Sequence, residues 1–178
     1  SDVALRVRNR CERLEVPHLP AMGGNPDVTR PGTRYTFRFS SSNRQSGLGT
    51  VQFFADQEVD RVAIIGADFS YPHAVAEAVQ DYAPAHDLAV DAVSFVPLGT
   101  DDFEEALAAI GDDVDGLFTP YPGDTAVSLV RQLHEREMFD DLVLYGDYSF
   151  GSGPYSRDLG PDVEGVHNSG VDTETDRF

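Results

Sequence analysis

The chain contains 178 residues, enough for one domain with a buried core or for one domain and part of a second. Acidic residues outnumber basic ones by 31 to 13, and the net charge is −18 at pH 7. A surface this negative repels nucleic-acid phosphates and anionic membranes, which argues against both as partners.

Every basic residue is arginine, and the sequence contains no lysine. Dense carboxylates without lysine are expected of a protein that stays soluble in concentrated salt, where screening acts over a few ångströms. We therefore expect a halophilic protein, with an acidic protein of ordinary habitat as the alternative.

Cys11 is the one cysteine, which excludes an internal disulfide and a cysteine-based metal cage. No run of about 18 apolar residues is present, nor a signal peptide with a charged start and an apolar middle. These observations predict that the chain is either cytosolic or lacks its natural beginning.

Residues 1–44 are predicted to form an incomplete unit. The pattern indicates a helix through Leu14, a short strand at Pro17–Met22, a loop rich in glycine and proline, and an extended segment at Tyr35–Phe39. One helix and two strands cannot bury both faces of a sheet. We infer that they belong to a second lobe whose remainder lies outside residues 1–178.

Apolar segments alternate with amphipathic helices between residues 48 and 146, a pattern typical of a parallel sheet covered on both faces. After a helix at Gly47–Gln57, strands are predicted at Val62–Gly66, Asp91–Leu98, Gly116–Tyr121 and Leu142–Gly146. The connecting helices are predicted at Tyr71–Tyr82, at Asp101–Gly111 with a capping box between Asp101 and Glu104, and from Pro122-Gly123-Asp124 onward. Right-handed crossovers then favour an α/β fold with a Rossmann-like layered parallel sheet, and residues 163–178 read as an extended connection leaving it.

In open parallel sheets, ligands bind beyond the carboxyl ends of the strands. The loops at that edge contain Tyr71, Tyr121, Asp147 and Tyr148. Tyrosines beside one carboxylate suit a zwitterionic amino acid, because the carboxylate pairs with an ammonium group and the rings cover apolar surface. The structural alternatives are that Asp147 is a turn residue, that Tyr71 only packs over its loop, and that Asp101 and Asp124 are helix caps.

Enzyme signatures are absent from the sequence. There is no lysine for a phosphate-binding loop, no G-x-G-x-x-G after a strand and no serine in a nucleophile elbow. The histidines are scattered singly, so we interpret them as surface or packing residues rather than metal ligands. We therefore predict no catalytic residue, no metal site and no cofactor.

Several short motifs follow one another in a specific order. They are Val16-Pro17, Asn25-Pro26 with Thr29, Tyr35-Thr36-Phe37-Arg38 with Ser41-Ser42, Val62–Gly66 leading to Tyr71, Val96-Pro97-Leu98-Gly99-Thr100-Asp101-Asp102-Phe103, and Val130-Arg131-Gln132. In this order, nearly the whole chain resembles the type 1 periplasmic solute-binding proteins that serve branched-chain amino-acid (Leu/Ile/Val) ABC transporters. The resemblance implies two α/β lobes joined by crossing strands, with residues 1–44 in the first lobe, 45–166 in the second, and 167–178 connecting back toward the first.

The resemblance also implies site residues. Tyr71 and the Tyr121-Pro122 step match aromatic positions of the cleft, and Asp147 or Tyr148 falls where an acidic group meets the ligand's ammonium. In the first lobe, Gly23, Gly24 and Ser1 match or lie near positions that hold the ligand's carboxylate. The hydroxyl residue common at the Gly24 position is missing, and this departure, together with Pro122, leaves the identity of the ligand open.

We therefore expect an extracellular solute-binding component of an ABC transporter, surface-anchored, secreted or periplasmic, that captures an amino acid or a similar small polar solute. Its partners would be that ligand and a membrane permease, with no nucleic acid and no membrane insertion by this segment. The alternative is the ligand-sensing effector domain of a regulator or receptor, and an enzyme built on the same layers is a third interpretation, because one fold serves all three roles.

Overall fold

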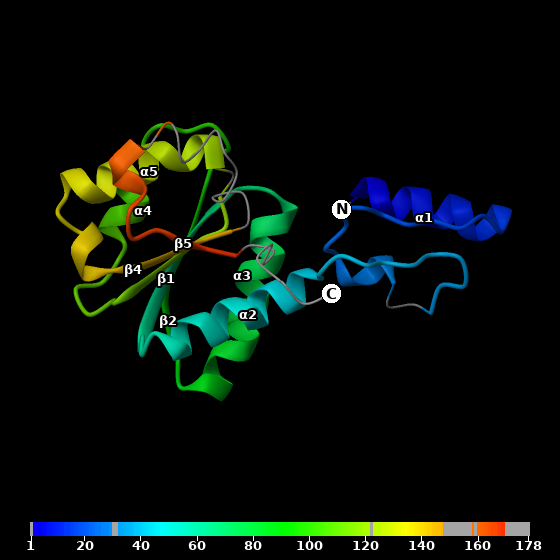
Figure 1. Ribbon diagram of the computed structural model, residues 1–178, viewed down its shortest axis with the longest axis horizontal. Helices are drawn as coiled ribbons and strands as arrows, with labels where there is room; N and C mark the ends of the chain where they lie inside the picture. Colours follow the sequence, from blue (N-terminus) through cyan, green and yellow to red (C-terminus); the bar gives the residue numbers. More distant parts are fainter. Residues whose placement is uncertain (1, 30–31, 122, 148–157, 159, 170–178) are drawn as a thin grey trace, which may run out of the picture.

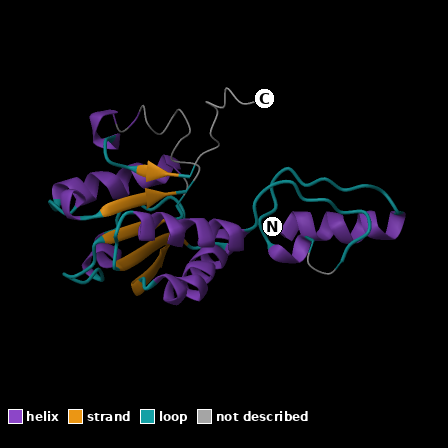
Figure 2. Ribbon diagram, turned by 60° about the horizontal axis from the view of Figure 1, so that its bottom comes forward, coloured by secondary structure: helices purple, strands orange, loops and turns teal. Residues whose placement is uncertain are grey.

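The computed structural model describes residues 2–29, 32–121, 123–147, 158 and 160–169 (Figure 1). The described chain has two parts. An N-terminal unit, residues 2–39, projects away from an α/β domain that begins at Ser42 (Figures 1 and 2). Residues 40 and 41 join the two.

The N-terminal unit consists of helix α1 (Asp2–Leu14), the short 3-10 helix η1 (Pro26–Val28) and extended segments. The predicted helix is confirmed, but the strand predicted at Pro17–Met22 is wrong. Its place is taken by a single bridge between His18 and Thr36, in which the His18 N–H donates to Tyr35 O at 2.7 Å and the Phe37 N–H donates to His18 O at 2.9 Å. One bridge without neighbouring strands does not make a sheet.

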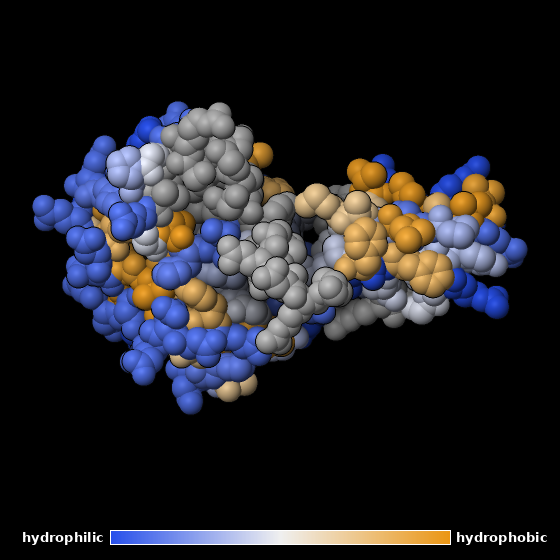
Figure 3. Space-filling model, in the orientation of Figure 1, coloured by the Kyte–Doolittle hydropathy of each residue, from blue (hydrophilic) through white to orange (hydrophobic). Residues whose placement is uncertain are grey.

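Apolar side chains of the N-terminal unit face solvent. Eight of the ten large hydrophobic residues with exposed side chains in the described chain lie in this unit, and they form much of its surface in Figure 3: Val3, Val7, Leu14, Val16, Leu19, Met22, Phe37 and Phe39. Leu19, Met22 and Phe39 are each more than 60% exposed. An apolar surface this dense is typical of an interface.

The α/β domain is built on one five-stranded parallel sheet with strand order β2-β1-β3-β4-β5. The strands are β1 (Arg61–Ala67), β2 (Ala89–Val96), β3 (Gly116–Thr119), β4 (Val143–Gly146) and β5 (His167–Asn168). The four predicted strands are present, and the start of the predicted connection supplies the fifth. The strand order reverses between β1 and β3, and such switch points open a crevice at the carboxyl ends of the strands.

Helices cover both faces of the sheet (Figure 2). On one face, α2 (Asn43–Asp56) and α3 (Ser70–Tyr82) pack Val51, Phe54, Val75 and Val79 against Ile64 and Phe118. On the other face, α4 (Glu104–Ala108) and α5 (Gly123–Glu135) pack Leu107, Leu129 and Leu133 against Ile65 and Leu117. Because both faces of the sheet are buried, the sequences of the strands are nearly continuous runs of apolar residues.

Two helix starts differ from prediction. Helix α2 begins at Asn43, four residues before the predicted start, because Ser42 and Gln45 form a capping box. The capping box predicted between Asp101 and Glu104 is wrong. The Glu104 N–H donates instead to Asp102 Oδ1 at 2.9 Å, and the Asp101 carboxylate accepts the Ser128 hydroxyl at 3.2 Å.

Close packing of α2 on α3 depends on Gly47. A Cβ at this position would lie 2.5 Å from Ala78 Cβ and 3.0 Å from the backbone of Ala78 and Val79. Neither the short alanine side chain nor the helix backbone can move aside without a loss of stability.

We expect Gly47→Ala to lower the free energy of unfolding by about 1–3 kcal/mol, because the overlap separates the two helices. Gly49→Ala is the matched control in the same helix, since a Cβ at that position would meet nothing within 4 Å. There the better helix propensity of alanine should raise stability by up to about 1 kcal/mol. Urea unfolding followed by circular dichroism measures both changes, and equal effects at the two positions would contradict the packing argument.

Glu12 fixes the extended segment of the N-terminal unit onto α1. Its carboxylate accepts the N–H groups of Arg34 and Tyr35 and the Thr36 hydroxyl, each at 3.0 Å. Partial burial raises the pKa of Glu12, but these hydrogen bonds and the nearby Arg8 outweigh burial and hold the pKa below its ordinary value. A pKa depressed by folding stabilises the folded state above the unfolded-state pKa, and the contribution is lost as pH falls through the folded-state value.

We therefore expect Glu12→Gln to speed hydrogen exchange of the Arg34 and Tyr35 amides at pH 7, measured against wild type at the same pH. The difference should shrink as the pH falls well below about 4, the ordinary range of a carboxyl group, because the wild-type side chain is then protonated too. Glu15→Gln, one residue beyond α1, serves as the control. A difference that persists unchanged at acid pH would contradict the role of the carboxylate charge.

Candidate functional site

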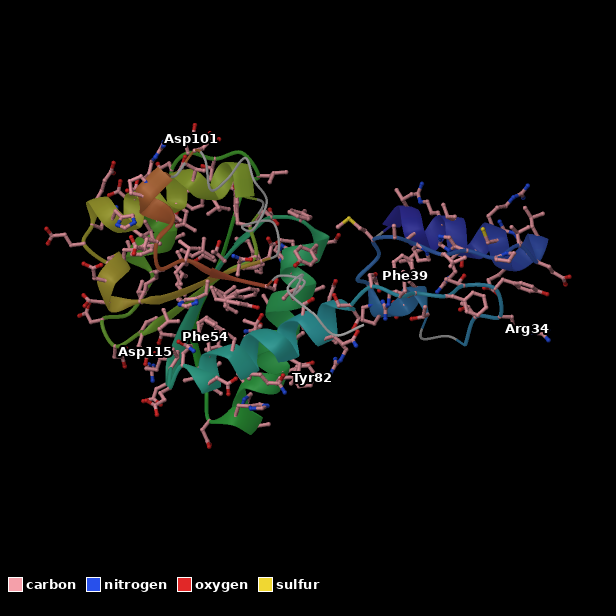
Figure 4. All side chains as sticks on the ribbon, in the orientation of Figure 1. Arg34, Phe39, Phe54, Tyr82, Asp101 and Asp115 are labelled. Carbon is pink, nitrogen blue, oxygen red and sulfur yellow. The ribbon has the colours of Figure 1, made fainter. Side chains whose placement is uncertain are left out.

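A cavity of about 550 Å³ lies at the carboxyl edge of the sheet, on the face covered by α2 and α3. Its wall comes from the end of the N-terminal unit, from the joining residues 40 and 41, from α2, α3, β3 and β4, and from the residues directly after β4 and β5. The lining residues are Phe39, Ser40, Ser41, Gln45, Ser46, Gly49, Thr50, Tyr71, Val75, Phe118, Tyr145, Asp147 and Ser169. Phe39 is the last residue of the N-terminal unit, beside which Figure 4 labels it.

Tyr71 and Asp147 line this one cavity, although they lie far apart in the sequence. Asp147 directly follows β4 and is only 6% exposed, while Tyr71 stands half-buried in the first turn of α3, after β1. Both positions follow from the rule that parallel strands end at the same edge of a sheet. The structure thus brings the two residues together, and their contact with a ligand stays a prediction.

The floor of the cavity contains Tyr145, which sequence reasoning did not select. Its ring stacks on Phe53 with centroids 4.3 Å apart and planes 21° apart. Burial raises the pKa of the Tyr145 phenol, the charge of Asp147 raises it further, and a hydrogen bond with the Ser169 side chain acts in the opposite direction. The phenol is therefore a neutral group at physiological pH. Tyr145 could have been predicted from side-chain alternation along β4, because a residue two positions before Asp147 faces the same side of the sheet.

Hydroxyl groups line the wall opposite the floor. The Thr50 hydroxyl donates to Ser46 O at 3.0 Å, and Gln45 Oε1 accepts the Ser42 N–H at 2.8 Å, so these groups are fixed by α2 itself. Ser40 Oγ is buried and has no hydrogen-bond partner among the described residues. A buried hydroxyl without a partner is destabilising, so Ser40 is a group that a polar ligand would satisfy.

Tyr121, predicted to be an aromatic cleft residue, does not line the cavity. It is fully buried in the core on the opposite face of the sheet, where its hydroxyl donates to Pro97 O at 2.7 Å and its ring meets Phe103 edge-on at 5.5 Å. Alternation explains the difference, because Leu117, Thr119 and Tyr121 face one side of the extended chain and Phe118 faces the other. The aromatic residue that this strand presents to the cavity is Phe118.

Gly23 and Gly24 do not line the cavity either. They hold the joining segment in place, since Gly23 O accepts Arg38 Nη1 at 3.3 Å and Gly24 O accepts the Asn43 N–H at 2.7 Å. A Cβ on Gly24 would lie 1.9 Å from Asn43 Oδ1, which explains why no larger residue stands there. Ser1, Pro122 and Tyr148, the other predicted ligand contacts, lie outside the described residues.

The described lining of the cavity contains one carboxyl group, that of Asp147, and no arginine or histidine of the described chain lines the cavity. Within the described ranges, no group of three or more histidine, cysteine, aspartate or glutamate residues is arranged to hold a metal ion. No described helix is both long and apolar enough to span a bilayer.

A family model described as "Periplasmic binding protein" matches residues 1–169. A search of curated proteins found no match. Among solved structures, the chain is similar to a putative branched-chain amino acid ABC transporter from Rhodospirillum rubrum, with 22% identity and a TM-score of 0.77 over 89% of this chain and 45% of that one.

Two further structures differ in their ligands. A branched chain amino acid ABC transporter from Thermus thermophilus with bound valine has 16% identity and a TM-score of 0.81, over 93% of this chain and 44% of that one. A solute binding protein of an ABC transporter from R. palustris in complex with benzoate has 16% identity and a TM-score of 0.77, over 93% of this chain and 46% of that one. The chain therefore spans less than half the length of these structures, which share its fold.

Proposed function

We propose that this chain, which belongs to the periplasmic binding protein family, is part of the solute-binding component of an ABC transporter and captures an amino acid or a similar small polar solute. The observation that carries the proposal is the cavity at the carboxyl edge of the sheet, where Tyr71 and Asp147 converge from separate strand ends. The family is one of solute binding rather than catalysis, and the proposal needs no metal or cofactor.

The charge of the cavity favours an ammonium-bearing ligand. Asp147 is a buried carboxylate, and a carboxylate at low solvent exposure attracts a cation more strongly than one in bulk water. Valine carries an ammonium group, whereas benzoate carries only a carboxylate. We therefore propose a ligand of the amino-acid class, with Tyr71 and Phe118 covering its apolar part and Ser40 a candidate hydrogen-bond partner.

The exposed apolar surface of the N-terminal unit supports a two-lobed molecule. Residues 1–44 would belong to the first lobe, 45–166 to the second, and 167–178 to a connection between them. We infer that further chain outside residues 1–178 covers Leu19, Met22 and their apolar neighbours, because the unit buries little of its own apolar surface. The complete first lobe would then form the second wall of the cleft.

Family membership supports an extracellular, cell-surface or periplasmic location with a membrane permease as partner. The alternative proposal is the ligand-sensing domain of a regulator or receptor, because the fold serves both roles. The discriminating observation is the sequence upstream of Ser1. A signal peptide followed by a lipid-accepting cysteine would support transport, and a helix-turn-helix would support regulation.

We expect Asp147→Asn, in the polypeptide that contains both lobes, to weaken binding of the preferred amino acid about 10- to 100-fold, measured by isothermal titration calorimetry. The reason is the loss of a charge-assisted hydrogen bond. Binding of the des-amino analogue, which lacks the ammonium group, should be weak in both proteins and should not fall further in the variant. Residues 1–178 alone should bind weakly or not at all, because one wall of the cleft is missing.

Asp140→Asn, on the exposed 3-10 helix η3 (Phe139–Asp141), is the matched control and should bind like wild type. The assignment to amino-acid transport fails if a panel of amino acids, amides and small carboxylates gives no heat of binding. The role of Asp147 fails if its variant binds as tightly as the control.

The acidic surface supports function in concentrated salt. We expect the melting temperature to rise by several degrees between about 0.1 M and 2 M KCl, because salt screens the repulsion among surface carboxylates. A variant with Glu77, Glu105 and Glu135 changed to Gln, all exposed, should show a smaller rise. A melting temperature that does not respond to KCl would leave the chain an acidic protein of ordinary habitat.

A further inference from the structure

Tyr145 occupies a fixed position at the floor of the cavity. Besides the stacked Phe53, its ring contacts Phe54 edge-on and lies tilted toward Phe118, each with centroids 6.0 Å apart. The side chain is only 9% exposed, and its hydroxyl is hydrogen-bonded to Ser169. An aromatic ring packed against three others inside a close-packed core has little room to rotate when a ligand enters.

The register of the last two strands places this ring beside Asp147. Tyr145 lies opposite His167, and Gly146 lies opposite Asn168, so the next residues along, Asp147 and Ser169, are also neighbours. Residues two apart on a strand point to the same face and stand roughly 7 Å apart. The carboxylate and the phenol ring therefore border the same part of the cavity, and an atom bound to Asp147 lies within reach of the ring.

We propose that Tyr145 is a specificity-determining residue that limits the size of the group a ligand places beside Asp147. The proposal rests on the function proposed above and deepens it. If Asp147 holds the ammonium group, the α-carbon and the start of the side chain lie next to the Tyr145 ring. Because the ring is fixed, a ligand with a bulky side chain overlaps it, whereas a compact side chain packs against it.

Tyr71 differs from Tyr145 in this respect. It stands at the start of a helix rather than within the sheet, it is half-buried, and its ring lies tilted to that of Phe69 with centroids 6.3 Å apart. The Tyr145 ring, by contrast, packs against three aromatic rings within the core of the sheet. The size limit is therefore assigned to Tyr145.

The test compares affinities for alanine, valine, leucine and phenylalanine, measured by calorimetry on the two-lobed protein and its variants. Tyr145→Ala should raise the affinity ratio of phenylalanine to alanine by about tenfold or more, the effect expected when space for several carbon atoms is created. Tyr145→Leu should shift the ratio in the same direction. It replaces the alanine variant in the test if that variant does not fold. Tyr145→Phe keeps the ring and removes only the hydroxyl, so it should keep the wild-type ranking.

The outcomes separate the two proposals. If the wild-type protein binds none of the four amino acids while Asp147→Asn has no effect on any ligand, the proposed function fails and the size limit fails with it. If the wild-type protein binds and the ranking is unchanged in a folded alanine or leucine variant, the size limit alone is overturned. A shift of ranking in Tyr145→Phe as large as that in Tyr145→Ala would also overturn it, because the hydroxyl rather than the ring would then set the preference.

Discussion

Burial of the parallel sheet on both faces determines where polar chemistry can occur in this molecule. Helices α2 and α3 cover one face and α4 and α5 the other, so the interior strands expose side chains to neither side. Only the loops at the two ends of the strands remain accessible. Because the strands are parallel, their carboxyl ends all lie on the same side of the domain. The cavity with Tyr71, Asp147 and Ser169 lies at that edge, and the segment 39–41 and the end of β5 both reach it. If the proposed two-lobe organisation holds, a ligand in this cavity would lie beside two connections between the lobes, and its binding energy could favour one arrangement of the lobes over another.

Alternation along each strand then decides which residue at the edge faces the cavity. Phe118 in the third strand faces the cavity, whereas Tyr121, two residues after the end of that strand, lies in the core on the opposite face of the sheet. Tyr145 in the fourth strand and Asp147 directly after it both line the cavity, and Leu144 faces the opposite core. A shift of one residue in either strand would exchange core and cavity residues. Because Tyr145 and Asp147 are two residues apart, the same alternation places both an aromatic and an acidic side chain in the lining of the cavity.

The elements that pack against other described residues of the chain were predictable from the sequence. The elements that lack such packing partners were not. Strands β1 to β4 follow from apolar runs, and the burial of Ala126, Leu129, Val130 and Leu133 follows from helical spacing. The strand expected at Pro17–Met22 reduces to the His18–Thr36 bridge, because the described N-terminal unit offers no sheet for it to join. Strand β5 could not be read as a strand because it is two polar residues long and pairs with β4 alone.

The candidate site was predictable to a similar extent. The strand-end rule selects Tyr71, Tyr121, Asp147 and Tyr148, and the family resemblance selects the Tyr121-Pro122 step as well. Of these residues Tyr71 and Asp147 line the cavity, whereas the third strand presents Phe118 to it instead of Tyr121. If the protein functions in concentrated salt, as proposed above, salt limits the range over which charged groups can discriminate between ligands. In concentrated salt, screening over a few ångströms removes, at the distance of the cavity, the field of the acidic residues on the protein surface. Discrimination between a zwitterion and an anion then depends on a charge at contact range, and Asp147 is the described lining residue that provides one, shielded from solvent ions by its burial.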